Sequence, residues 1–142
     1  MKTVNLKILL VLVIAVLLPA CTTARAGGEK VQPSVVEAIE GSEFSRVTLT
    51  EKAVERLDIQ TTLVSTNGNQ EKVVPYAAVM YGLNGETWTY TNPESRVYVR
   101  QVIVIDRIEG DLAVLTEGPE DGTPVVTVGA SLLYGAEVGV SK

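Results

Sequence analysis

Short stretches of this chain alternate hydrophobic and polar residues, as expected of β-strands. Six such stretches are rich in β-branched or aromatic residues and lie at 59–66, 72–80, 87–91, 96–108, 112–116 and 125–128. Between them, "LNG" and "IEGDL" are typical of tight hairpin turns. Arg100 and Gln101 interrupt one alternation, which indicates a bulge. The pattern predicts a mainly antiparallel β-domain, arranged as a small barrel or sandwich.

One short helix is expected, at "EKAVERLD", residues 51–58. Thr50 precedes it and is suited to accept a hydrogen bond from an early helical N–H. Leu49 and Val54 have the spacing of a hydrophobic staple across the start of a helix. Val54 and Leu57 are therefore expected to face the core of the domain.

The first 20 residues have the pattern of an export signal. Lys2 and Lys7 precede an uncharged run at 8–18, and the small residue Ala20 stands where a signal peptidase would cut. This run is shorter than the roughly 20 apolar residues that a transmembrane helix needs. Residues 1–20 are therefore predicted to be a signal peptide.

The next residue, Cys21, is the chain's single cysteine, so no disulfide can form within one chain. The segment "LPAC" resembles the lipobox of bacterial lipoproteins, in which the cysteine receives diacylglycerol and becomes the new N-terminus. The alternatives are an ordinary signal-peptide residue lost on processing, or a buried thiol. Two acyl chains hold a protein stably at a membrane. The resemblance implies an extracytoplasmic protein anchored to a bacterial membrane through diacylglyceryl Cys21.

Residues 21–45 contain several Gly, Ser and Pro residues and few large apolar ones, and are predicted to be a flexible tether. Within them, residues 35–39 are compatible with a helical turn or with an added strand. The remaining residues, 46–142, are numerous enough for one hydrophobic core but not two. A single β-rich domain is expected there.

The chain is acidic, with 12 basic and 17 acidic residues and a net charge of −5. Removing residues 1–20 removes two lysines and no acid, which leaves 10 basic against 17 acidic residues, a net charge of −7. Such a surface does not attract nucleic acid or anionic headgroups by charge. The acidity suits a soluble domain that is tethered by lipid and held off the membrane surface, and it is explained equally well by a role in solubility alone.

Two stretches carry a resemblance to a known family. They are "RVTLTEKAVERLDIQTTLV" and the region from "KVVPYAAVMYGLNGETWTYT" to "RVYVRQVIVIDRIEGDLAVLTEGPEDGTPVVTVGASLLYGAEV". Together they resemble the later half of the periplasmic adaptors, or membrane fusion proteins, of efflux pumps. The matching positions are Val74, Pro75, Ala78, Gly85, Trp88, Tyr90, Arg100, Gly118, Gly122, Val125, Val126 and Gly129. Pro119 replaces the leucine that is usual in the family.

Between its two matched stretches the family has a lipoyl-like module and an α-helical hairpin, where this chain has only "STNGNQEK". The resemblance therefore implies a truncated, non-catalytic adaptor-like lipoprotein. Such a protein would dock on or modulate a membrane efflux transporter of the RND or ABC type, or bind another adaptor. The alternative is a cell-envelope lipoprotein that binds a small ligand, or serves a structural role, without a pump.

The residue inventory argues against an enzyme and against a cofactor. The chain has no histidine, which is the commonest general base and zinc ligand. It contains no G-x-S-x-G, G-x-G-x-x-G or P-loop sequence. Asp106, Glu109 and Asp111 are the remaining candidates for a carboxylate pair, but they flank a turn, where acids are ordinary.

Two features are candidates for a metal site. The acidic loop at 117–122 lacks the ligand spacing of an EF-hand calcium loop. Met80 is the only methionine left after processing, too few for a copper or silver site built from methionines. No metal is therefore predicted.

Two pairs of side chains are candidates for binding. Trp88 and Tyr90 would form an aromatic platform for a sugar or drug, or else belong to the core. Arg96 and Arg100 share a strand face and would grip an acidic partner, or else form an ordinary solvated face.

Overall fold

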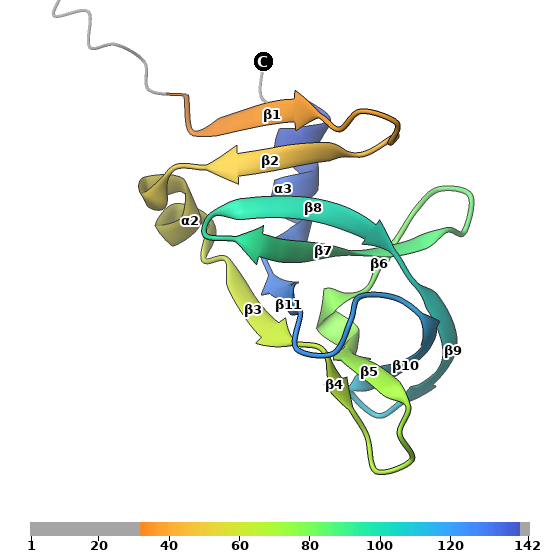
Figure 1. Ribbon diagram of the computed structural model, residues 1–142. Helices are drawn as coiled ribbons and strands as arrows, with labels where there is room; N and C mark the ends of the chain where they lie inside the picture. Colours follow the sequence, from red (N-terminus) through yellow and green to blue (C-terminus); the bar gives the residue numbers. More distant parts are fainter. Residues whose placement is uncertain (1–31, 140–142) are drawn as a thin grey trace, which may run out of the picture. The chain divides into compact units, whose positions relative to one another are not determined.

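The structure is a computed structural model that describes residues 32–139 (Figure 1). Two antiparallel sheets make up most of it. The larger sheet has seven strands in the order β1-β2-β8-β7-β11-β3, with β6 paired to β7, and the smaller has four in the order β4-β5-β10-β9.

In chain order, the elements are β1 (Ser34–Ala38), β2 (Ser45–Leu49), α2 (Glu51–Leu57), β3 (Gln60–Leu63), β4 (Ser65–Thr66), β5 (Lys72–Pro75), the 3-10 turn η1 (Tyr76–Ala78), β6 (Met80–Tyr81), β7 (Thr87–Glu94), β8 (Val97–Val102), β9 (Val104–Glu109), β10 (Leu112–Glu117), β11 (Pro124–Val128) and α3 (Ala130–Glu137). The expected mainly antiparallel β architecture is confirmed. The two sheets do not close into a barrel over residues 32–139.

The expected helix forms as α2, and its start has the predicted cap. The Thr50 side chain accepts a hydrogen bond from the Ala53 amide at 3.2 Å. Leu49 is buried, and Val54 and Leu57 pack against the same core. This agreement follows from local sequence chemistry, because capping and staple residues lie within a few positions of one another.

The prediction of a single helix was wrong, because α3 is a second one. It begins after Gly129, which adopts φ 86°, and it makes no side-chain capping hydrogen bond. Figure 1 shows α3 packed across one face of the larger sheet, where Ala130 and Leu133 are buried. The helix therefore has no side-chain cap and is held mainly by this packing.

The expected strand at 96–108 is divided into β8 and β9. The break falls at Ile103, which is 1% exposed, and not at Arg100 and Gln101. The backbone passes there from the larger sheet to the smaller one, and the Ile103 amide donates to the Thr87 carbonyl at 3.0 Å. The chain therefore changes sheets at a buried residue, and the backbone amide of that residue keeps its hydrogen bond.

The folded region begins earlier than residue 46. Strand β1 lies inside the segment 21–45 that was expected to be a tether, and it pairs with β2 from Ser34 opposite Leu49 to Ala38 opposite Ser45. Of the two conformations that the sequence allowed for residues 35–39, the added strand is confirmed for residues 35–38.

The buried side chains form two clusters, where one core was expected. One lies between the larger sheet and the two α-helices and includes Val47, Trp88 and Leu133. The other is centred on the smaller sheet and includes Val74 and Ile103. Strand β11 contributes a side chain to each cluster, because consecutive strand residues point to opposite faces. Val125 lies in the second cluster and Val126 in the first. The two clusters nevertheless belong to one compact unit.

Candidate functional site

Helix α3 is fixed to the larger sheet by a buried carboxylate at its last residue, Glu137. The Arg100 Nη2 donates to Glu137 Oε1 at 3.0 Å, and Arg100 Nε lies 2.9 Å from Oε2. The Tyr90 hydroxyl donates to Oε2 at 2.5 Å, and the Ser45 amide donates to Oε1 at 3.1 Å. The Arg100 and Glu137 side chains are only 15% and 3% exposed, so this ion pair is largely removed from water.

Three aromatic rings surround the Arg100 guanidinium. Its central carbon lies 4.6 Å from the ring centroid of Phe44, 5.0 Å from that of Trp88 and 5.4 Å from that of Tyr134. Rings at these distances attract a cation through their quadrupoles. The rings and Glu137 together compensate the charge that folding takes out of water.

The environment of Tyr90 shows how dry this cluster is. Burial raises the pKa of the Tyr90 hydroxyl well above its ordinary value, and the neighbouring Glu137 carboxylate raises it further. The phenol therefore stays protonated and remains a hydrogen-bond donor to Glu137. Its hydroxyl is thus engaged in the contact that holds α3 to the sheet.

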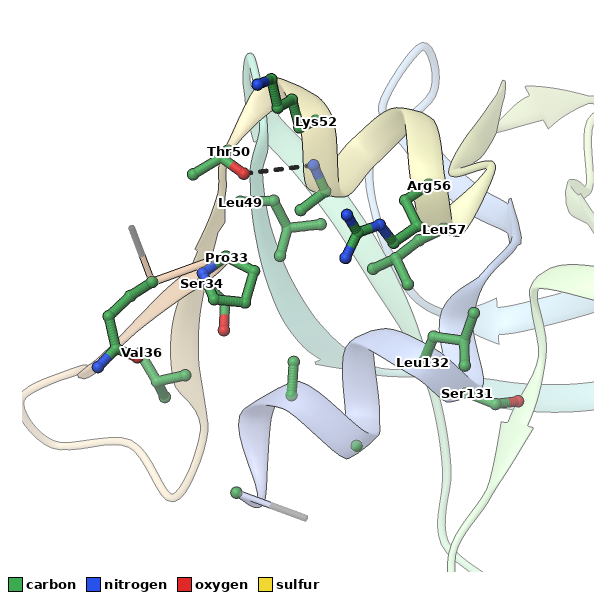
Figure 2. Close-up of a pocket in the computed structure, with 15 residues that line it drawn as sticks. Pro33, Ser34, Val36, Leu49, Thr50, Lys52, Arg56, Leu57, Ser131 and Leu132 are labelled. Atoms are coloured by element: carbon green, nitrogen blue, oxygen red, sulfur yellow. Dashed lines mark hydrogen bonds between the residues drawn. The ribbon is translucent and has the colours of Figure 1, made fainter. Parts of the chain in front are cut away.

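The opposite side of α3 borders a groove of about 810 Å³ (Figure 2). Its other walls are the outer face of α2 and the strand β1 with the two residues before it. Leu49 at the β2–α2 junction and Ala53 of α2 also line it, although both are almost fully buried. Gly135 and Ala136 on α3 have little or no side chain, which leaves room between the elements.

Two apolar side chains stand at one end of this groove and remain partly open to solvent. Leu57 from α2 and Leu132 from α3 lie on facing elements in Figure 2. Leu132 is 53% exposed, and Val36 of β1, on the opposite wall, is 40% exposed. Burial of such side chains by a ligand would stabilise the complex by about 25 cal/mol for each Å² of apolar surface covered.

The charge of the groove differs from that of the whole chain. Its lining contains Lys52 and Arg56 but no Asp or Glu among the described residues. In Figure 2 the Arg56 side chain points into the space between α2 and α3, whereas Lys52 lies on the outer side of α2. Their spacing of four residues places both on one face of the helix. The groove is therefore a small basic and apolar site on an acidic protein.

The groove is the feature that sequence reasoning missed. Its walls come from segments far apart in the chain, which no local pattern brings together. The one signal that was present is the spacing of Lys52 and Arg56, which predicts a basic stripe on a short helix.

The two candidate binding pairs have different outcomes. Trp88 and Tyr90 are 4% and 0% exposed and stack edge-to-face with ring centroids 5.4 Å apart. They belong to the core, and the platform interpretation was wrong. Arg96 and Arg100 do not form a joint surface, because Arg96 lies in the β7–β8 turn with φ 63° and Arg100 is enclosed by aromatic rings.

The candidate catalytic carboxylates are held in structural contacts or separated. The Arg107 guanidinium donates to Asp106 at 2.7 Å, to Glu109 at 2.7 Å and to Glu71 at 2.8 Å. Asp111 accepts a hydrogen bond from the Tyr76 amide through its backbone carbonyl. Their contacts give no sign of a paired general acid and base.

The two candidate metal sites, the acidic loop at 117–122 and Met80, both lie within the described residues. No cluster of three or more metal-ligating side chains occurs within residues 32–139. In the acidic loop, Asp121 accepts a hydrogen bond from the Thr66 hydroxyl, and the Gly118 carbonyl accepts one from Lys72. Met80 packs against the first core cluster.

Cys21, the predicted lipidation site, lies outside the described residues. None of the helices in residues 32–139 has the length and apolar character needed to cross a bilayer. Comparisons with protein-family models, curated proteins and solved structures found no match.

Proposed function

We propose that this chain is a non-catalytic, lipid-anchored adaptor-like protein that docks on or modulates a membrane efflux transporter, or binds another adaptor. The single observation that carries the proposal is the groove between β1, α2 and α3, which exposes apolar side chains next to two basic ones. Exposed apolar surface beside polar groups is typical of contact sites. The class of partner is proposed from the resemblance of the motif order to that of the efflux adaptors.

The buried ion pair supports a docking role for this groove in particular. Glu137 lies on the side of α3 that faces the sheet, and Leu132 and Gly135 lie on the side that faces the groove. Fixing one side of the helix holds the other at a constant distance from α2. A groove with rigid walls loses less conformational entropy when a partner binds.

A second candidate function is a cell-envelope lipoprotein that binds a small ligand. The volume of the groove, about 810 Å³, favours it, because pockets for small molecules range from about 300 to 1,000 Å³. Stoichiometric recovery of a small molecule with the purified protein, and of no protein partner, would favour this candidate over an adaptor.

Co-purification in mild detergent tests the proposal. The full-length wild-type protein is compared with Leu132→Glu, which places a charge in the groove, and with Leu63→Glu as a control. Leu63 lies on β3 outside the groove and is 58% exposed, close to the 53% of Leu132. We expect a transport component with the wild type and with Leu63→Glu but not with Leu132→Glu. Equal recovery with all three proteins, or none with the wild type, would contradict the proposal.

A further inference from the structure

We infer that the groove binds a peptide segment of the partner that combines carboxylates with apolar side chains. This inference rests on the proposed function and specifies the chemistry of the docking contact. Lys52 and Arg56 line the groove, and no acidic residue is part of its lining. The predicted mature chain as a whole carries a net charge of −7. Anionic groups are therefore attracted to this place and repelled by the rest of the surface.

The apolar part of the site sets the second requirement. Val36, Leu57 and Leu132 provide a surface that a purely charged ligand would leave uncovered. An apolar side chain lying between α2 and α3 would cover them while a neighbouring carboxylate reaches Arg56, which points into the same space. Both requirements are met by one segment in which acidic and apolar residues are close neighbours.

The polar lining favours a peptide over a lipid chain. Gln32, Ser34 and Ser131 also border the groove. An acyl chain would cover their polar groups without replacing lost hydrogen bonds to water, which is costly. A peptide backbone carries donors and acceptors that can pair with them.

Strand β1 gives a second reason to expect a peptide in the groove. Among the described strands it pairs with β2 only and forms the end of the larger sheet. Its other edge therefore presents unpaired backbone N–H and C=O groups, as in proteins that bind an extended peptide by strand addition, and Ser34 and Val36 of the same strand line the groove. A bound strand would direct alternate side chains toward the groove.

The segments on either side of the described residues carry no excess of acidic side chains. Residues 22–31 contain Arg25 and Lys30 against one acid, Glu29, and residues 140–142 end in Lys142. Residues 22–31 are therefore net basic and would be repelled by Lys52 and Arg56, and residues 140–142 contain no acidic side chain. A segment of another protein complements the site better.

Peptide display on the full-length protein in nanodiscs tests the inference. A library of random nine-residue peptides is selected against the wild type, against the double variant Lys52→Glu/Arg56→Glu, and against Arg46→Glu. Arg46 is an exposed β2 residue outside the groove lining and serves as the control for a charge reversal. Selected peptides are then measured by fluorescence anisotropy in low and high salt.

The wild type and Arg46→Glu are expected to enrich peptides that combine Asp or Glu with Val, Ile or Leu. These peptides should bind the double variant at least about tenfold more weakly, and should lose affinity in high salt because exposed ion pairs are screened. Selection on the double variant should enrich Lys or Arg instead. Peptides without acidic residues, binding unaffected by the double variant, or no enrichment at all would overturn the inference.

Two further outcomes would also overturn it. Displacement of the selected peptides by laurate micelles, with laurate bound in stoichiometric amount, would assign the groove to lipid. Enrichment that appears only after deletion of residues 140–142 would assign it to the chain's own end. Any of these results can occur while a transport component still co-purifies with the wild type and not with Leu132→Glu. In that case the proposed function stands and only the peptide chemistry fails.

Discussion

At the scale of single residues, Glu137 is the side chain on which the position of α3 depends most. Its carboxylate accepts hydrogen bonds from a guanidinium, a phenol and a backbone amide, and its side chain is 3% exposed. Removing it would leave Arg100 as an uncompensated charge among aromatic rings. Breaking one side of a buried ion pair typically costs about 3–5 kcal/mol.

We therefore expect Glu137→Ala to lower the free energy of unfolding by about 3 kcal/mol in urea denaturation. Glu120→Ala, an exposed acid whose side chain makes no hydrogen bond in residues 32–139, should change it by less than about 0.5 kcal/mol. Equal effects of the two substitutions would show that the Glu137 cluster contributes nothing specific.

A second prediction at this scale concerns pH and Glu71. Hydrogen bonds from Arg107, and then from Asn67, lower the pKa of the Glu71 carboxyl from 4.5 to about 2. Because the pKa is lower in the folded state, this contact stabilises the fold fully above pH 4.5, and the stabilisation is lost as pH falls toward 2. We expect the melting temperature to drop over that interval, and to drop less in Glu71→Gln. Identical pH profiles would contradict this assignment.

At the scale of elements, the start of α3 depends on Gly129. It adopts φ 86°, and an added Cβ would lie 2.4 Å from Ile59 Cδ1 and 3.1 Å from the Leu57 carbonyl oxygen. We expect Gly129→Ala to destabilise the protein by about 1–2 kcal/mol.

Gly135, in the same helix, is the matched control for this glycine. Nothing lies within 4 Å of a Cβ added there, and its backbone is helical. Gly135→Ala should stabilise the fold by about 0.5–1 kcal/mol, because alanine has the higher helix propensity. Urea denaturation of both variants measures the difference, and destabilisation by Gly135→Ala would contradict the described helix.

The contrast between the two helices shows what the sequence could predict. Helix α2 carries its signals locally, in the Thr50 cap and the Leu49–Val54 staple, and was predicted. Helix α3 begins without a side-chain cap and contains a glycine at residue 135, and its stability comes from Leu133 in the core and from Glu137 on Arg100. Arg100 and Glu137 are 37 residues apart, and no local pattern could pair them.

Among the strands, too, only the features set by neighbouring residues could be predicted. Alternation and turn residues predicted the hairpins, in which the structure places Met80 opposite Trp88 and Leu112 opposite Glu109. The division between β8 and β9 could not be predicted, because it depends on which cluster buries Ile103. The groove was missed for a similar reason, since its shape depends on how α3 packs.

At the scale of the whole molecule, the anchor and the groove would act together. Covalent geometry lets the eleven residue steps from Cys21 to Gln32 span at most about 36–40 Å. A lipid on Cys21 would therefore keep the groove within tens of ångströms of the membrane. Segments of membrane proteins next to the bilayer would be within its reach.

The anchor itself can be tested by Cys21→Ser. We expect the wild type to fractionate with membranes and to show the mass of a diacylglyceryl group on its N-terminal peptide, and the variant to leave the membrane fraction in a carbonate wash. A wild type with an unmodified thiol would rule out lipidation at Cys21.

The most direct test of the central claim is site-specific photo-crosslinking from the groove in intact cells. A photoreactive phenylalanine analogue replaces Leu132, or Leu63 as the control, in the full-length protein. We expect an ultraviolet-dependent product from position 132 that contains a membrane transport component and is lost with Lys52→Glu/Arg56→Glu. No product from position 132, or the same product from position 63, would contradict it.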